Sequence, residues 1–273
     1  GGIERESKLA NFVYESNEHI EKVVRHILNP NNAYVKFDFE NGKPQKSAIL
    51  TTSSIDMAKR YYAKFKELTA DEDWVERLFS DQPIHKGKVI ADPNFPRIAI
   101  TYSLEENADD SSQAQAEMAE IIEDYNQRYG TSWDLTSMAR YNGDINNRLA
   151  RKKAEFRKPG NQVDLVIVVD RLLTGFDAPT VQSLFVDRNL SYANLIQAFS
   201  RTNRTYPGKT KGMIVTYRKP HTMEQNVADA TRLYSNNQEE SHLIYPNYGE
   251  SKQKFIQSSK RFENLLSDED YAD

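Results

Sequence analysis

The chain has 273 residues, with 36 Lys and Arg against 40 Asp and Glu, so its formal net charge at pH 7 is −4. This balance excludes a uniformly basic nucleic-acid-binding protein, although it allows a basic face, because net charge is a sum over all faces. The absence of cysteine excludes a disulfide scaffold, a thiolate zinc site and a cysteine nucleophile, and it predicts an intracellular protein. No run approaches about 18 apolar residues, so no membrane span is predicted.

The first 43 residues predict a helix followed by a strand. Ser16 can accept a hydrogen bond at the start of a helix over residues 17–28, where apolar side chains recur on one face. Asn and Pro residues at 29–32 end that helix. Residues 33–39 alternate between apolar and polar side chains from Val35 onward and therefore predict a strand.

From residue 47 onward, apolar runs typical of strands alternate with segments of helical spacing. The predicted strands cover residues 47–51, 97–103, 164–169, 181–186 and 212–217. The predicted helices cover residues 55–68, 74–79, 113–129, 144–156, 193–204, 222–236 and 250–266. Strand 164–169 is apolar at every position after Asp164, as expected for a central strand covered on both faces. The alternation predicts an α/β fold with a mainly parallel sheet flanked by helices.

Charge is distributed unevenly along the chain. Residues 67–134 contain 16 acidic and 5 basic residues, whereas residues 139–219 contain 15 basic and 6 acidic ones. The basic block coincides with the most apolar strands, where a site for a polyanion would be useful. For residues 148–158 alone, a helix with a solvated Lys and Arg face is an equally good interpretation.

The segment Thr-Gly-Phe-Asp-Ala-Pro at 174–179 follows strand 164–169. Ligands of open α/β sheets bind beyond the carboxyl ends of the strands. Thr174 could supply a hydroxyl, Gly175 lets backbone N–H groups approach a phosphate, and Asp177 could accept hydrogen bonds from ribose hydroxyls. Taken alone, the segment is explained more simply as a turn.

The pattern Gln-x-x-Ser-Arg-x-x-Arg at 197–204 lies on the predicted helix 193–204. Arg201 and Arg204 are three residues apart and share one face of that helix. Two guanidinium groups on one face are costly unless an anion meets them, and their planar donors match phosphate oxygens. Surface arginines that pair with an acid such as Asp187 are the alternative interpretation.

Together the two segments resemble motifs V and VI of superfamily 2 helicases. The longer strings at 169–179 (VDRLLTGFDAP) and 194–204 (NLIQAFSRTNR) are similar to those of the restriction subunit (R, or motor subunit) of type I restriction-modification enzymes. The resemblance is dense over residues 160–218 and looser over residues 46–103. It implies a second RecA-like motor domain over 44–220.

The same resemblance implies the surroundings of that domain. Residues 1–43 would connect it to the first motor domain, and residues 221–273 would begin a helical C-terminal region. The first residue is Gly rather than Met, which also predicts a piece of a longer protein. The resemblance further implies the cytoplasm of a bacterium or archaeon.

The resemblance also assigns roles at the nucleotide. Arg204 would be the catalytic arginine finger on the γ-phosphate of ATP, and Arg201 would be its catalytic partner in the nucleotide cleft. Gln197 would couple that cleft to motif V, while Gly175 and Asp177 would face the nucleotide. ATP with Mg would be bound mainly by the first RecA-like domain.

On the DNA side, the resemblance implies contacts with the backbone of double-stranded DNA. Thr174 would lie toward the DNA, and Thr51, Thr52 and Ser53, at the end of the first predicted strand, would contact phosphates. The implied protein partners are the methyltransferase and specificity subunits of the type I complex. The intact protein would be an ATP-dependent translocase and site-specific deoxyribonuclease.

Motifs that ATP hydrolysis requires are missing from the sequence. Gly208-Lys209-Thr210 resembles the end of a phosphate-binding loop, but Asn203 replaces the first Gly and a helix precedes the segment. Val168-Val169-Asp170 resembles a Walker B strand, but Arg171 follows where an acid is expected.

A nuclease or metal site is not predicted either. The Glu-x-Lys tripeptides at 6–8 and 250–252 lie in polar helical stretches, and the five histidines are scattered. We therefore expect the chain alone neither to hydrolyse ATP nor to cut DNA. Two alternatives stay open: another superfamily 2 helicase or remodeller, and a non-enzymatic DNA-binding or assembly module with a degenerate RecA-like fold.

Overall fold

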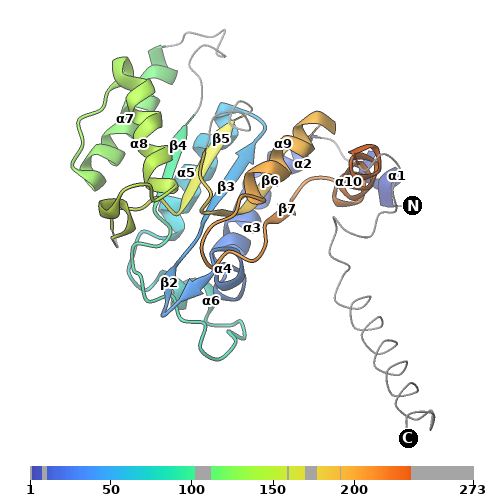
Figure 1. Cartoon of the computed structure of the whole chain (residues 1–273), viewed down its shortest axis with the longest axis horizontal. Helices are drawn as coiled ribbons and strands as arrows, with labels where there is room; N and C mark the ends of the chain where they lie inside the picture. Colours follow the sequence, from blue (N-terminus) through green and yellow to red (C-terminus); the bar gives the residue numbers. More distant parts are fainter. Residues whose placement is uncertain are drawn as a thin grey trace, which may run out of the picture. The chain divides into compact units, whose positions relative to one another are not determined.

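A computed structural model describes residues 2–7, 11–101, 112–158, 160–169, 177–190 and 192–234 (Figure 1). Residues 1–226 form one compact unit and residues 227–273 a second. The sheet and the residues of the candidate site lie in the first unit. Among its described residues, no helix is both long and apolar enough to cross a membrane.

A parallel sheet of five strands forms the centre of the described fold, in the order β4-β5-β3-β6-β7. In that order the strands are Ile98–Thr101, Leu165–Val169, Ser47–Thr52, Val181–Asp187 and Met213–Thr216. Leu50 of β3 lies opposite Ile167 of β5 and Phe185 of β6. All three central strands are fully buried, which confirms the predicted α/β, RecA-like fold.

Helices precede, connect and follow the strands. They are α1 (Gly2–Ser7), α2 (Asn11–Tyr14), α3 (Asn17–Leu28), α4 (Pro30–Lys36), α5 (Ile55–Leu68), α6 (Trp74–Phe79), α7 (Ser112–Tyr129), α8 (Met138–Leu149), α9 (Tyr192–Thr202) and α10 (Pro220–Tyr234). The connections through α5 and α9 cross the sheet in opposite directions. Because such crossovers are right-handed, α5 and α9 cover opposite faces. Figure 1 shows α7 and α8 beside the edge strand β4.

Residues 33–39 were predicted as a strand, and this prediction is wrong. They lie in α4 and the turn after it, and only Phe39–Glu40 (β1) pairs with Lys43–Pro44 (β2). The side chain of Asn29 accepts a hydrogen bond from the Asn31 N–H, and Pro30 occupies the first turn. The Asn-Pro pair that ends α3 therefore also begins α4.

The helix predicted over 144–156 is displaced toward the N-terminus. Helix α8 covers Met138–Leu149, and Arg151 then adopts a positive φ of 51°. That left-handed residue stops the helix, and a separate short 3₁₀ helix covers Ala154–Arg157. The basic run at 148–158 is thus a helix end and a loop rather than one helical face.

The N-terminal segment contributes to the core of the same unit. Ile20, Val24 and Ile27 of α3 are at most 1 % exposed. Phe37 lies edge to face with Phe95, with ring centroids 5.0 Å apart, and its centroid is 6.2 Å from that of Phe185 on β6. Residues 17–44 therefore cover the sheet itself.

Candidate functional site

Arg204 and Asp177 form an ion pair at the surface. Arg204 lies two residues beyond the end of α9, and its Nη1 donates to Oδ1 of Asp177, four residues before β6. The side chains are 43 % and 60 % exposed. The structure thus brings together one residue from each of the two segments that the sequence analysis singled out.

The ion pair lies at the amino-terminal edge of the sheet. Strand β5 ends at Val169, and the parallel strand β6 begins at Val181, so the chain near Asp177 has returned to the start of the next strand. Helix α9 likewise returns the chain from the end of β6 to the start of β7. Asp177 therefore does not lie at the carboxyl ends of the strands, where ligands of open α/β sheets usually bind. Residues 170–176, which include Thr174 and Gly175, lie outside the described residues.

The carboxyl end of β6 holds a different cluster of charges. Asp187 is fully buried, and it accepts hydrogen bonds from Tyr61 Oη at 2.8 Å, Arg218 Nε at 3.1 Å and His19 Nε2 at 2.8 Å. Burial raises the pKa of Asp187, but the hydrogen bonds from His19 and Arg218 outweigh it and hold the pKa below its ordinary value. The acid suggested as a partner for the surface arginines is thus bound by other groups.

Arg201 and Gln197 extend the site along α9. Arg201 is half-buried and Gln197 is exposed. Burial and the positive charge of Arg204 lower the pKa of Arg201, and Asp177 opposes this shift. The two guanidinium groups are therefore close enough to influence each other. The predicted helix 193–204 ends at Thr202, however, so Arg204 lies in the following loop and not on the helical face of Arg201.

Thr51, Thr52 and Ser53 lie at the opposite edge of the sheet, where β3 ends. The Thr51 and Thr52 side chains are buried, and Thr52 Oγ1 donates to the carbonyls of Ser54 and Val168 at 3.1 and 3.3 Å. Ser53 is exposed, and its Oγ accepts from Arg218 Nη2 at 3.3 Å. Among the three, only Ser53 presents its side chain to the solvent, and contact with DNA stays a prediction for all of them.

Lys209 is a residue of this site that the sequence analysis dismissed. Its Nζ donates to the carbonyl oxygens of Pro179, Val181 and Arg204 at 3.2, 2.7 and 2.9 Å. The tripeptide at 208–210 therefore lies beside the ion pair, although it does not form a phosphate-binding loop. The sequence feature that could have indicated this role is the position of the lysine in the short loop between α9 and β7.

Gly212 allows the loop after α9 to close against the helix. A Cβ atom at this position would lie 2.5 Å from the carbonyl oxygen of Thr202, the last residue of α9. We expect Gly212→Ala to lower the free energy of unfolding by about 1–3 kcal/mol, because backbone must shift to relieve this contact. Gly143→Ala is the matched control, since no atom lies within 4 Å of its added Cβ. Urea denaturation of both variants measures the difference, and equal stabilities would contradict the prediction.

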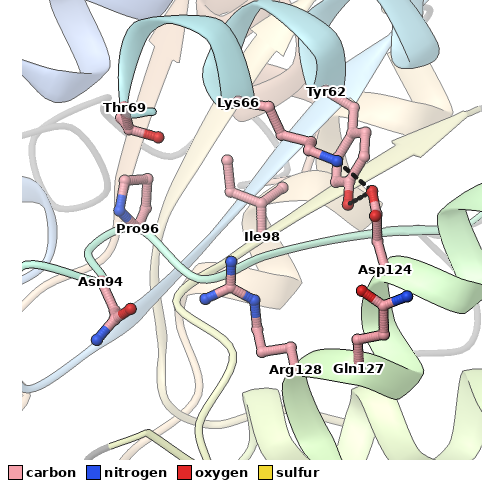
Figure 2. Close-up of a pocket in the computed structure, with 9 residues that line it drawn as sticks. All are labelled: Tyr62, Lys66, Thr69, Asn94, Pro96, Ile98, Asp124, Gln127 and Arg128. Carbon is pink, nitrogen blue, oxygen red and sulfur yellow. Dashed lines mark hydrogen bonds and ion pairs between the residues drawn. The ribbon is translucent and has the colours of Figure 1, made fainter. Parts of the chain in front are cut away.

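A separate pocket of about 500 Å³ lies between α5, α7 and the start of β4 (Figure 2). Lys66 forms an ion pair with Asp124, which also accepts a hydrogen bond from Tyr62 Oη at 3.2 Å. Figure 2 shows the Arg128 side chain directed from α7 toward Ile98. None of the predicted site residues lines this pocket.

A metal site is not formed by the described residues, which contain no group of three or more His, Asp or Glu side chains able to hold an ion. Glu6, from the first Glu-x-Lys tripeptide, accepts hydrogen bonds from the backbone N–H groups of His221 and Thr222, both at 2.8 Å. Its carboxylate therefore caps the start of α10.

The strand order and the crossover helices define a RecA-like α/β domain. The family model of type I restriction enzyme subunit R domain 3 matches residues 44–219, and the chain therefore belongs to this family. It is 30 % identical over 245 residues to the type I restriction enzyme SsaAORF53P endonuclease subunit of Staphylococcus saprophyticus, covering 89 % of this chain and 23 % of that protein.

A second relative, the SauMRSORF196P endonuclease subunit of Staphylococcus aureus, is 28 % identical over 260 residues, which are 93 % of this chain and 24 % of that protein. The chain thus spans about a quarter of the length of these relatives. Among solved structures, a fragment of an HsdR subunit from Vibrio vulnificus YJ016 matches with a TM-score of 0.41 and 14 % identity, covering 84 % of this chain and 32 % of that one. The DNA-bound Type ISP enzyme LlaBIII matches with a TM-score of 0.43 and 17 % identity, covering 78 % and 12 %.

Proposed function

We propose that this chain is the second RecA-like motor domain of a type I restriction R subunit and supplies the arginine finger for ATP hydrolysis. The exposed Arg204 guanidinium, held at the end of α9 by Asp177, is the observation that carries this proposal. Family membership favours a restriction motor over another superfamily 2 helicase or remodeller.

The chemistry of Arg204 suits this role. Phosphoryl transfer spreads negative charge over the transferred group, and a guanidinium offers planar paired donors that stabilise that charge. In the structure, Asp177 occupies Nη1 of Arg204. Binding of a γ-phosphate would replace or share that carboxylate, while Arg201, in the last turn of α9, adds a second positive charge nearby. Gln197 lies one turn earlier on the exposed side of α9.

The remaining parts of the motor would come from elsewhere in the R subunit. The 273 residues contain no Gly-x-x-x-x-Gly-Lys-Ser/Thr loop, so ATP with Mg would be held mainly by the first RecA-like domain. Closure of the two domains would bring Arg204 to the γ-phosphate, and cycles of closure would move double-stranded DNA. Thr174 and the residues at the end of β3 would form part of the surface that contacts the DNA backbone. The methyltransferase and specificity subunits would be the protein partners of the assembled complex.

The purified chain should therefore show no ATP turnover above background, with or without DNA, because it holds only half of the nucleotide site. A coupled phosphate-release assay with linear duplex DNA measures this. The intact R subunit, assembled with its partner subunits, is the positive control. DNA-stimulated hydrolysis by the chain alone would contradict the proposal, and absence of hydrolysis by the intact assembly would favour a non-enzymatic module.

A further inference from the structure

The loop between α9 and β7 is held by the half-buried ammonium group of Lys209. Lys209 Nζ has three donors, and the structure gives each of them a carbonyl acceptor, on Pro179, Val181 and Arg204. Among the described residues, no carboxylate forms an ion pair with Lys209. An ammonium whose donors are all used by backbone carbonyls is a connector of chain segments rather than a ligand for phosphate.

The three carbonyls belong to two segments that are far apart in the sequence. Pro179 and Val181 follow Asp177 and lead into β6, whereas Arg204 belongs to the loop after α9. Lys209 therefore joins the backbone on both sides of the Arg204–Asp177 ion pair. The ion pair itself is exposed, so its geometry depends on how firmly these two backbones are held.

The charges around Lys209 are mostly positive. Burial and the nearby Lys46 lower the pKa of Lys209 to about 8. Lys46 itself pairs with Asp38 at 3.2 Å and lies 5.6 Å from the ring centroid of Tyr206, in the same loop as Lys209. The other charged groups on the connected segments are Arg204, Lys211 and Asp177, and of these Arg204 and Asp177 bind each other.

We propose that Lys209 is a positioning residue that sets the place of Arg204 by cross-linking the segment before β6 to the loop after α9. The catalytic part of this inference rests on the proposed function of Arg204. Lys209 would touch neither nucleotide nor DNA, and it would act only through the backbone of Arg204 and of the segment that carries Asp177. Its place in Gly208-Lys209-Thr210 thus has an explanation that requires no phosphate-binding loop.

A pH titration of the purified chain by NMR tests the cross-link directly. With ¹³C- and ¹⁵N-labelled protein, the Lys209 side chain should titrate near pH 8, well below an ordinary lysine near 10.4. The Arg204 carbonyl carbon should shift with the same midpoint as Lys209, because deprotonation removes one of the three donors. An Arg204 carbonyl that does not follow the titration of Lys209, at whatever pH that titration occurs, would overturn the proposal.

Two variants separate positioning from general loss of structure. In Lys209→Met, the titration of the Arg204 carbonyl near pH 8 should disappear. Lys209→Arg keeps several donors, so the ¹³C chemical shift of the Arg204 carbonyl should stay at the value of a hydrogen-bonded carbonyl. Lys211→Met is the matched control, because this exposed lysine lies in the same loop. If Lys209→Met does not fold, the titration of the wild-type chain and the Lys209→Arg variant still test whether Lys209 binds the Arg204 carbonyl.

In the intact R subunit, Lys209→Met should lower kcat for ATP about 10–100-fold with little change in DNA binding, because a displacement of about 1 Å costs up to that much. Lys211→Met should turn over ATP like wild type. An Arg204→Ala subunit that turns over ATP normally would defeat the proposed function while the NMR coupling stands. If Arg204→Ala loses ATP turnover while Lys209→Met keeps normal turnover, the positioning role of Lys209 is wrong and the proposed function of Arg204 stands.

Discussion

Arg204→Ala in the intact R subunit should reduce ATP turnover by about 10³–10⁵-fold and abolish translocation, which is the usual range for an arginine finger. Binding of DNA by the assembled complex should change little, since Arg204 lies at the amino-terminal edge of the sheet with Asp177 and not with the residues at the end of β3. Steady-state phosphate release and a filter-binding titration of duplex DNA measure the two quantities.

Two control variants make this result specific. Arg204→Lys keeps the positive charge but loses the planar fork, so it should recover only a small part of the turnover. Arg140→Ala removes an exposed arginine from α8 and should leave turnover unchanged. Loss of DNA binding with normal ATP turnover in Arg204→Ala would show that Arg204 binds the DNA rather than the nucleotide.

Arg97→Met should lower the free energy of unfolding by about 3–5 kcal/mol, because it leaves buried carboxylates without their partner. Arg97, the residue before β4, is 2 % exposed and contacts Asp92 at 2.8 Å and Asp164 at 3.1 Å. Asp164 is fully buried, and burial raises its pKa in spite of the attraction of Arg97. The melting temperature should fall by roughly 10 °C.

The pH dependence of that loss has a definite sign. Without Arg97 the pKa of Asp164 rises further, so the folded variant binds a proton more readily than the unfolded chain. The stability lost at pH 7 should therefore be partly regained as the pH falls toward 5. Arg77→Ala, which breaks the exposed pair with Asp71, is the control and should cost at most about 1 kcal/mol. A change in Arg97→Met no larger than in this control would contradict the prediction.

Local patterns predicted the elements well where a single cause decides the structure. Strand β5 follows from its unbroken apolar run, and α3 begins where Ser16 caps the His19 N–H. The strand predicted over residues 33–39 is wrong because the Asn-Pro pair at 29–30 starts a helix, and this signal outweighs a short alternation of apolar and polar residues. The end of α8 depends on the left-handed Arg151, which composition does not reveal.

The candidate site was predictable in its residues but not in its place. The closeness of Arg201 and Arg204 follows from their separation of three residues, although α9 ends at Thr202 and leaves Arg204 in the loop. The pairing of Arg204 with Asp177 at the amino-terminal edge depends on the path between β5 and β6, which periodicity does not specify. Two of the three carbonyl partners of Lys209, on Pro179 and Val181, lie 30 and 28 residues away, and no motif encodes such contacts.

The Asp187 cluster has a practical consequence for where this domain can be divided. It ties α3 through His19, α5 through Tyr61 and the end of β7 through Arg218 to one buried carboxylate. A protein trimmed to the family match at residues 44–219 would lose α3, and with it one hydrogen bond to Asp187 and the apolar cover of the sheet. The smallest unit worth expressing therefore begins before Ser16, some thirty residues upstream of the boundary that family similarity suggests.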